Sequence, residues 1–498
     1  MASSWLVTTD LGISDCPRKS PQAMSTHSLG ELAQRHLQII RDHYEQSPPL
    51  TRAARSYRRI LAHHYNLIIP PDASVLEIGC GCGDLLARLN PRNVHGIDLS
   101  KVQIERAQKN VPQGTFSVQV GETLDLQDRK FDYIIISDTL NQAADVQQLF
   151  AQLHLCSHDN TRLILNFHSA LWRPALSLAS TLRIRPAPPH NSWLTSTDVH
   201  GLLALSGWET IKTSPRILSP LHLGGVGSLI NRWAGPMLPL LCLSIFSISR
   251  RTRVNQAKPQ SVSVIIPARN EAGNIENAVL RTPEMGSETE LIFIEGHSTD
   301  NTWDEIERVA AKYGAARQIK ILRQTGKGKG NAVREGFAQA QGEILMILDA
   351  DLTMPPEELP KFYDAIAEGH CDFANGCRLV YPMEGKAMPF LNLCANKVFS
   401  LLFSWLLRQP IKDTLCGTKV LTAANYRQIA AQRHYFGDFD PFGDFDLLFG
   451  ADKLNLKIVD IPIRYRDRSY GETNIQRWKH GWLLLRMVAF AARKLKFV

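Results

Sequence analysis

The sequence predicts an α/β protein with two domains in one chain of 498 residues. Short apolar runs that read as strands alternate with helical stretches, first between residues 74 and 167 and again from residue 261, which is typical of parallel sheets wound with helices. The basic, polar segment SRRTRVNQAKPQ at 249–260 separates the two series. Hydrophobic residues make up 44% of the chain and charged residues 21%, which is the composition of a folded globular protein.

The chain divides into five segments by these patterns. We expect a flexible tail at 1–28, a first α/β domain at 29–250, a linker at 251–260, a second α/β domain at 261–474 and a basic amphipathic helix at 475–498. The tail lacks a long apolar stretch behind a basic start, so a secretory signal is not expected. The nine cysteines form no regular framework, which favours a reducing, cytoplasmic location.

The first domain is expected to begin with two helices between residues 29 and 67, because apolar residues recur at helical spacing on both sides of a Ser-Pro-Pro turn. Four strand-like runs follow: SVLEIGC, VHGIDL, FDYIIIS and RLILNF. The helical stretches between them are DLLARL, KVQIERAQKN and DVQQLFAQLHL. A later uncharged stretch at 233–249 is broken by glycine and prolines, so it predicts a buried strand, LCLSIFSI, rather than a membrane span.

A glycine-rich turn follows the first strand of this domain. Gly79, Gly81 and Gly83 stand where VLEI runs into a helical stretch, and positions without side chains let a ligand approach the backbone. Fifteen residues past Gly83, Asp98 ends the next strand, at the edge of the sheet where ribose hydroxyls of a nucleoside would lie. One ligand is therefore predicted to contact both strands.

Glu77, the three glycines and Asp98 give the spacing ExGxGxG followed by an acid, and residues 29–250 resemble the class I methyltransferases in this respect. The resemblance implies a Rossmann-like domain that binds S-adenosyl-L-methionine, with Asp98 on the ribose and Glu122, in VGETL, beside the adenine. The cofactor-binding residues so implied are Glu77, Gly79, Gly81, Gly83, Asp98 and Glu122. An NAD-binding domain is the alternative, but the further helix glycine of that pattern is missing.

The methyl acceptor is not identified by the sequence, because methyl transfer needs chiefly the alignment of a nucleophile with the sulfonium, and a base only for some acceptors. Tyr57, His168 and His190 are candidates for assisting groups. A structural role is favoured for each of them.

Two carboxylates end a strand of the second domain. The strand EILMIL delivers Asp349 and Asp351 to its C-terminal end, one residue apart, where both can face a single Mg²⁺ or Mn²⁺ ion. Such an ion, bridging a diphosphate, would stabilise the charge on a departing nucleotide. Two solvated acids are the alternative, and the flanking segments favour the metal site.

Those segments fall in the order of the family 2 glycosyltransferases of GT-A fold, which residues 261–474 resemble. SVIIPARNE matches the first nucleotide-binding strand and IEGHSTDNT the second, where Glu295 stands in for the usual aspartates. Lys327 and Lys329, in GKGKGNAVREGFAQAQGE, either counter diphosphate charge or form a solvated basic loop. The nucleotide-sugar-binding residues implied are Pro267, Ala268, Arg269, Glu271, Glu295, Lys329, Asp349 and Asp351, the last two also as metal ligands.

Three later segments, IKDTLCGTKVL, GDFDLLFGA and IPIRYRDRSYGETN, resemble the polyprenyl-phosphate (dolichol-phosphate) branch of that family. The resemblance implies that the first two wall the acceptor side and that transfer inverts the anomeric carbon. It implies catalytic roles for Asp444 and Asp446, where a carboxylate takes the proton of a hydroxyl acceptor. The candidate acceptor-binding residues are Arg378, Asp413, Lys419 and Arg468, and an arginine fork suits phosphate oxygens.

The net charge of +8 is concentrated at the C-terminal end, since the last twenty-two residues hold six basic residues and no acid. The final segment, GWLLLRMVAFAARKLKFV, has too few apolar residues to cross a bilayer. Together with VFSLLFSWLL at 398–407, it favours peripheral contact with the cytoplasmic face of a membrane. A nucleic-acid partner is not expected, because it would need a basic groove near residues 79–98.

The sequence therefore predicts a bifunctional enzyme. One activity is metal-dependent, inverting transfer of a sugar from a nucleotide-sugar to a lipid-linked or glycan acceptor, and the other is S-adenosyl-L-methionine-dependent methylation in the same pathway. The alternative is an active glycosyltransferase fused to a non-catalytic, methyltransferase-like binding module.

Overall fold

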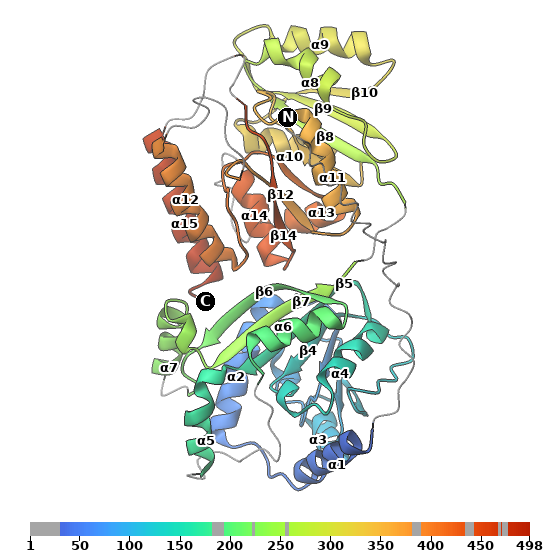
Figure 1. The fold of residues 1–498 in the computed structure, drawn as a ribbon, viewed down its shortest axis with the longest axis vertical. Coiled ribbons are helices and arrows are strands. Elements are labelled where there is room, and N and C mark those ends of the chain that lie inside the picture. The colour runs from blue at the N-terminus through green and yellow to red at the C-terminus, as the bar shows by residue number, and fades with distance from the viewer. Residues whose placement is uncertain are drawn as a thin grey trace, which may run out of the picture.

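The computed structural model describes residues 30–181, 194–221, 225–253, 258–380, 390–433, 443–466, 470 and 477–498. The predicted tail at 1–28 lies outside these residues, as does the candidate His190. Each of the two domains is built around a seven-stranded sheet, and the N-terminal domain lies below the C-terminal one in Figure 1. The prediction of two α/β domains is confirmed.

The N-terminal sheet is parallel except at one strand. In spatial order its strands are β3 (Thr115–Val118), β2 (Val94–Asp98), β1 (Val75–Ile78), β4 (Phe131–Ser137), β5 (Ser157–His168), β7 (Ser244–Arg251) and β6 (Trp208–Ile217). Strand β7 runs antiparallel to both of its neighbours and contains most of the predicted strand LCLSIFSI. The helices are α1 (Glu31–Glu45), α2 (Arg52–Ile68), α3 (Lys101–Asn110), α4 (Val146–Gln152), α5 (Arg173–Thr181), α6 (Ser196–Leu205) and α7 (Val226–Leu229).

Helices cover both faces of this sheet because its central strands are apolar on both sides. In β4, Tyr133 and Ile135 join the core that contains α2 and α3, whereas Ile134 and Ile136 join the core that contains α4 and α6. This alternation follows from the period of two along a strand. The first helices predicted, between residues 29 and 67, are observed as α1 and α2.

One predicted helix is shorter than expected. DLLARL forms only a three-residue 3-10 helix, Leu86–Arg88, after which Leu89 is extended with ψ of 150°. The next residue, Asn90, precedes Pro91, and a residue before proline is disfavoured in the helical region. The chain therefore leaves the helical conformation one turn after the glycine-rich turn.

The C-terminal sheet has a similar architecture. In spatial order its strands are β10 (Gln318–Arg323), β9 (Thr289–Glu295), β8 (Val262–Ala268), β11 (Ile344–Ile347), β13 (Lys419–Thr422), β12 (Phe373–Cys377) and β14 (Ile458–Pro462), and β13 is the antiparallel one. The helices are α8 (Ile275–Arg281), α9 (Thr302–Tyr313), α10 (Lys329–Gln339), α11 (Leu359–Ala367), α12 (Phe390–Leu407), α13 (Ala423–Ala431), α14 (Asp444–Lys453) and α15 (Arg477–Leu495).

The C-terminal helix α15 belongs to the core of its domain on one face. Leu484, Met487 and Ala491 are buried with residues of α12 and α14, and α15 lies beside α12 in Figure 1. Its other face leaves Trp482 67% and Leu485 45% exposed. No helix in the described part of the chain is long and apolar enough to cross a membrane.

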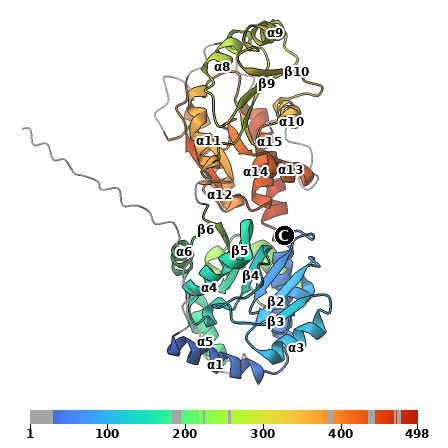
Figure 2. The same cartoon turned by 90° about the vertical axis from the view of Figure 1, so that its right-hand side faces the viewer.

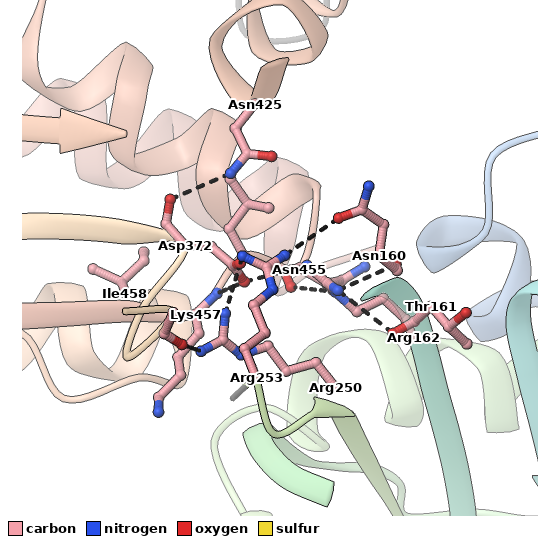
Figure 3. A network of polar contacts seen from close by, with 12 residues as sticks. Asn160, Thr161, Arg162, Arg250, Arg253, Asp372, Asn425, Asn455, Lys457 and Ile458 are labelled. Atoms are coloured by element: carbon pink, nitrogen blue, oxygen red, sulfur yellow. Dashed lines mark hydrogen bonds and ion pairs between the residues drawn. The ribbon is translucent and has the colours of Figure 1, made fainter. Parts of the chain in front are cut away.

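A buried ionic network joins the two domains (Figure 3). Asp372, the residue before β12, accepts hydrogen bonds from Arg250 Nη1 at 2.6 Å and Arg162 Nη2 at 3.2 Å. Arg253 lies 3.3 Å from the same carboxylate. Arg250 and Asp372 are fully buried, and their opposite charges compensate for the loss of water.

Further ion pairs extend this interface. Lys212, on β6, donates to Asp452 Oδ1 at 2.7 Å, and Lys457 Nζ lies 2.5 Å from Glu209. Lys453 Nζ donates to the carbonyl of Leu67 at the end of α2. The N-terminal sheet therefore meets the second domain along the start of β5, the end of β7 and the length of β6.

Candidate active sites

The glycine-rich turn of the N-terminal domain is open to a ligand at its centre. Gly79 and Gly81 have φ of 71° and 52°, in the left-handed region that glycine tolerates without strain. A Cβ on Gly79 would lie 2.5 Å from a Thr139 methyl, whereas one on Gly81 would meet no described atom within 4 Å. Asp98 fixes the turn, because its Oδ2 accepts the Gly81 N–H at 2.9 Å and its Oδ1 accepts the Ser100 N–H.

Glu77 is buried at the base of this turn. Only 1% of its surface is exposed, and its Oε2 has no hydrogen-bond partner in the described part of the chain. Burial raises the pKa of Glu77 to about 8, although the nearby Arg58 opposes this shift. A buried carboxylate oxygen without a donor is costly, so this position suits a ligand that supplies an N–H group.

Glu122 is also buried, but backbone donors already occupy its carboxylate. Its Oε1 accepts the Ala144 N–H at 2.8 Å and lies 3.5 Å from the Asp145 nitrogen. Burial raises the pKa of Glu122, and these donors oppose that shift. Glu122 therefore fixes the loop that leads into α4.

A second polar cluster adjoins the turn and contains Tyr57 and His168, for which the sequence favoured a structural role. Tyr57 Oη lies 2.6 Å from Ser244 Oγ and 3.4 Å from both His168 Nε2 and Asp138 Oδ1. Asn166 Nδ2 donates to the same Asp138 oxygen at 2.6 Å. Burial, reinforced by the Asp138 carboxylate, raises the pKa of Tyr57 well above its ordinary value.

These residues come from four parts of the chain but lie at one end of the sheet. Asp138 follows β4, His168 ends β5 and Ser244 begins β7, while Tyr57 comes from α2. One signal in the sequence pointed to this cluster, because Asp138 directly follows the predicted strand FDYIIIS. In the observed sheet the carboxyl end of that strand, β4, lies beside that of β1.

In the C-terminal domain, three segments converge at the end of β11. Lys329, the first residue of α10, places Nζ 2.6 Å from Asp349 Oδ1. Gly417 lies against both, since a Cβ there would be 2.1 Å from Asp349 Oδ2 and 2.2 Å from Lys329 Nζ. The absence of a side chain at Gly417 thus leaves room for this ion pair.

Asp351 is held by the turn that follows it, because its Oδ1 accepts both the N–H and the hydroxyl of Thr353, at 3.1 and 2.9 Å. Among the described residues, no three His, Cys, Asp or Glu side chains gather closely enough to form a complete metal site. The two aspartates supply hard oxygen ligands that suit Mg²⁺ or Mn²⁺, provided that a substrate completes the coordination.

The predicted donor-binding residues lie on neighbouring strand ends. Pro267 and Ala268 end β8, Arg269 follows them, and Glu295 ends β9, directly beside Ala268 in the register. Glu295 Oε1 accepts the Ser298 N–H at 2.5 Å. Nearby, Glu271 is buried and accepts from Asn274 Nδ2 at 2.8 Å.

On the predicted acceptor side, Arg378 and Asp413 bind each other. Arg378 Nε and Nη2 donate to the two oxygens of Asp413 at 2.7 and 2.9 Å. Burial alone would raise the pKa of Asp413, but the guanidinium outweighs it and holds that pKa well below its usual range. Lys419 is fully buried, and its ammonium donates to the Cys416 carbonyl.

The remaining predicted residues are only partly described. Asp446, on α14, accepts from Arg433 Nε at 3.0 Å. Asp444 is the first residue of α14, but its side chain lies outside the described residues, as does all of Arg468.

Each domain matches a protein-family model. Residues 49–213 match the model described as methyltransferase domain, and residues 263–430 match that of glycosyl transferase family 2. The chain joins a methyltransferase domain to a family 2 glycosyltransferase domain. The two predicted activities thus have a domain each.

Two curated relatives and one solved structure are representative. Over 223 residues the chain is 30% identical to a dolichol-phosphate mannosyltransferase of Pyrococcus furiosus, covering 43% of this chain and 59% of that protein. Over 220 residues it is 26% identical to an undecaprenyl-phosphate 4-deoxy-4-formamido-L-arabinose transferase of Edwardsiella ictaluri, covering 43% and 62%. The chain thus spans about three fifths of these relatives. A TehB-like methyltransferase structure from Corynebacterium glutamicum matches with a TM-score of 0.27 at 16% identity, over 44% of this chain and 97% of that one.

Two strands run from the domain interface to a candidate site. Strand β12 of the glycosyltransferase domain begins beside Asp372, at the domain interface, and ends beside Arg378, next to Asp413. Strand β5 of the methyltransferase domain likewise runs from the interface, near Arg162, to His168. The two domains are stacked along the long axis of the molecule (Figures 1 and 2).

Proposed function

We propose that the chain is a bifunctional enzyme that transfers a sugar from a nucleotide-sugar to a lipid-linked or glycan acceptor and methylates a substrate of the same pathway. The main support for the sugar transfer is a cluster of residues at the end of β11: Asp349, Asp351, Lys329 and Gly417. The family assignment of residues 263–430 supports it, as do the two relatives named for transfer involving dolichol phosphate and undecaprenyl phosphate.

Sugar transfer requires charge stabilisation on the leaving nucleotide diphosphate. Asp349 and Asp351 would hold Mg²⁺ or Mn²⁺, which supplies a positive charge to the diphosphate oxygens. Lys329, which pairs with Asp349 in the free protein, would bind a phosphate oxygen of the diphosphate in place of that carboxylate. Pro267, Ala268, Arg269, Glu271 and Glu295 would bind the nucleoside from the ends of β8 and β9.

The acceptor would approach from the side of Arg378, Asp413, Lys419 and Arg468. Because Arg378 already forms two hydrogen bonds to Asp413, we assign Asp413 the role of orienting the guanidinium toward an acceptor phosphate. A phosphate acceptor is already anionic and needs no base, whereas a hydroxyl acceptor would give its proton to Asp444 or Asp446.

The methyltransferase domain would bind S-adenosyl-L-methionine through Glu77, Gly79, Gly81, Gly83, Asp98 and Glu122. The unpartnered Glu77 Oε2 suits the amino group of this cofactor, and the open side of Gly81 suits close contact with the backbone. The cofactor supplies an electrophilic methyl group. His168, held near Asp138 and Tyr57, is positioned to take a proton from an acceptor.

The enzyme would work at the cytoplasmic face of a membrane. Exposed apolar side chains gather on the α7 to η7 (Pro239–Leu241) region of the methyltransferase domain and on α12 and α15 of the other domain. They are Val226, Leu229, Trp233, Met237, Leu240, Leu401 and Trp482. The two regions adjoin, because Trp405 donates to the Pro236 carbonyl and Trp233 stacks on Phe497. Their common apolar face suits peripheral attachment.

Nucleotide release from UDP-, GDP- and dTDP-sugars tests the sugar transfer, with Mg²⁺ or Mn²⁺ and with polyprenyl phosphate or a lipid extract as acceptor. We expect release from one donor that requires the metal, rises with the acceptor and is lost in Asp351→Asn. No release from any donor would refute this activity. For the second domain, binding of S-adenosyl-L-methionine without methyl transfer to the glycosylated or unglycosylated acceptor would indicate a binding module instead.

A further inference from the structure

A cleft of about 340 Å³ opens between the two domains. The methyltransferase domain contributes Thr213, Pro215, Pro236 and Pro239, and the glycosyltransferase domain contributes Ser404, Trp405, Arg408, Gln409, Pro410 and Lys496. A smaller cavity of about 70 Å³ shares Arg408 and adds Lys212, Arg216 and Asp452 to its lining. We call the larger space the interdomain cleft.

Two basic side chains in the interdomain cleft have no hydrogen-bond acceptor among the described residues. Lys496 is 3% exposed, and its Nζ lies 5.3 Å from the ring centre of Trp405. Arg408 Nη1 is buried and has no hydrogen-bond partner in the described part of the chain. Buried polar groups are ordinarily hydrogen-bonded, so two basic groups without acceptors in one cleft point to a missing anionic ligand.

The neighbouring side chains offer no acceptor to Arg408 and Lys496, because they bind other partners. Lys212 uses Asp452, the one carboxylate side chain that lines either cavity, in a 2.7 Å ion pair. Arg216 donates to the backbone carbonyls of Leu495 and Lys496 at 2.9 and 3.1 Å. Burial, with Arg408 and Arg216 adding to it and Asp452 opposing it, lowers the pKa of Lys496. A bound anion would raise that pKa again and stabilise the charged ammonium.

We propose that the interdomain cleft binds a phosphate group through Arg408 and Lys496. An arginine fork and a lysine ammonium together match the tetrahedral oxygens and the double charge of a phosphate. Arg216 positions the segment that carries Lys496, because it holds the carbonyls at the end of α15. The phosphate would thus bind at the domain interface, where Arg216 of the methyltransferase domain holds the end of α15 of the other domain.

This site is distinct from the acceptor-binding residues of the glycosyltransferase domain. Asn396, on α12, donates to Asp413 at the acceptor side, and Arg408 comes twelve residues later, directly after the end of the same helix. A helix rises about 1.5 Å per residue, so the two positions are about 18 Å apart. The cleft therefore does not belong to the sugar-transfer site.

The phosphate has two possible sources, a soluble phosphate compound or the head group of a lipid. Arg408 and Lys496 would bind the phosphate of either source equally well. The surface around the cleft is apolar, because Met237 and Leu240, next to the lining prolines, are 64% and 78% exposed. A lipid phosphate would reach the cleft with its chains beside these side chains, whereas a soluble phosphate would not need them.

The test uses the full chain and two probes. The first is inorganic pyrophosphate, followed by calorimetry and by the shift in Tm, and the second is flotation with phosphatidylcholine vesicles with and without phosphatidic acid. Variants are Arg408→Gln and Lys496→Gln. The control is Arg493→Gln, which removes one exposed charge from the last turn of α15, the helix that Lys496 follows.

We expect the wild type and Arg493→Gln to bind at least one probe and both cleft variants to lose at least tenfold in affinity. Binding of pyrophosphate alone would assign the site to a soluble phosphate; vesicle binding that needs phosphatidic acid and is competed by pyrophosphate would assign it to a lipid. Without ligand, the cleft variants should melt at or above the wild-type Tm, because each removes a buried basic group that has no acceptor. A lower Tm in both variants, unchanged affinity in either, or no binding of either probe would overturn the proposal.

Discussion

Arg250 and Asp372 join the two domains through a fully buried ion pair, with Nη1 2.6 Å from Oδ1. Arg250 is the last residue but one of β7 in the methyltransferase domain, and Asp372 precedes β12 of the other domain. Arg162 and Arg253 share the same carboxylate. This arrangement fixes the two domains to each other at the end of β7 and the start of β12.

The first prediction concerns this network. Asp372→Asn should lower the free energy of unfolding by about 3–5 kcal/mol, because it leaves buried arginines without their carboxylate. Urea denaturation followed by tryptophan fluorescence measures it. Glu284→Gln is the matched control: it removes a 66% exposed carboxylate from its pair with Arg317 and should cost less than about 1 kcal/mol. Equal losses in the two variants would contradict a structural role for the network.

The second prediction concerns Glu77, whose pKa of about 8 keeps it protonated at pH 6.5 in the free protein. If its carboxylate receives the ammonium of S-adenosyl-L-methionine, binding must release a proton. Calorimetry at pH 6.5 in buffers of different ionisation enthalpy should detect up to one proton released, and affinity should rise up to tenfold between pH 6 and 7. Glu77→Gln should release no proton. Binding to the wild type without proton release would exclude this contact.

The third prediction concerns Gly417. Its replacement by alanine would bring a Cβ to 2.1 Å from Asp349 Oδ2, so the carboxylate and Lys329 must shift. We expect nucleotide release to fall at least tenfold while binding of S-adenosyl-L-methionine is unchanged. Gly201→Ala, on α6, is the control, because a Cβ there meets no described atom within 4 Å and should leave both properties intact. An unaffected rate in Gly417→Ala would remove Asp349 from the reaction.

The fourth prediction concerns His168. If His168 takes the acceptor proton, His168→Ala should lower methyl transfer by about 10²–10⁴-fold and leave cofactor binding within twofold. Transfer of labelled methyl from the cofactor to a lipid extract measures the rate, and His370→Ala, an exposed histidine of the other domain, is the control. Parallel loss of cofactor binding would instead indicate a structural role for His168, the role that the sequence favoured.

The fifth prediction concerns membrane attachment. Leu240 and Leu401 are 78% and 72% exposed on adjoining parts of the two domains. Changing both to glutamate should weaken vesicle flotation by at least tenfold, because burial of one leucine is worth about 1.5–3 kcal/mol. Leu280→Glu, on α8 of the glycosyltransferase domain, removes a leucine that is 58% exposed and should have no effect. Equal loss in the control would mean that the apolar face is not the attachment site.

Local pattern was sufficient to predict much of this protein. Alternating apolar runs predicted the two wound sheets, and the glycines after the first strand predicted a tight turn beside the strand that ends at Asp98. The pair Asp349 and Asp351 was recognisable because both follow one strand. DLLARL was the exception, since helical spacing alone did not account for the proline that follows it.

What the sequence by itself determined were features encoded within a few residues: strand period, turn chemistry and motif order. Only the tertiary structure decided which distant residues meet: Tyr57 with His168, Gly417 with Asp349, and Arg250 with Asp372. It also decided that Arg408 and Lys496 line one cleft. The reason is physical, because such pairings depend on strand order and domain docking, and neither leaves a periodic signal along the chain.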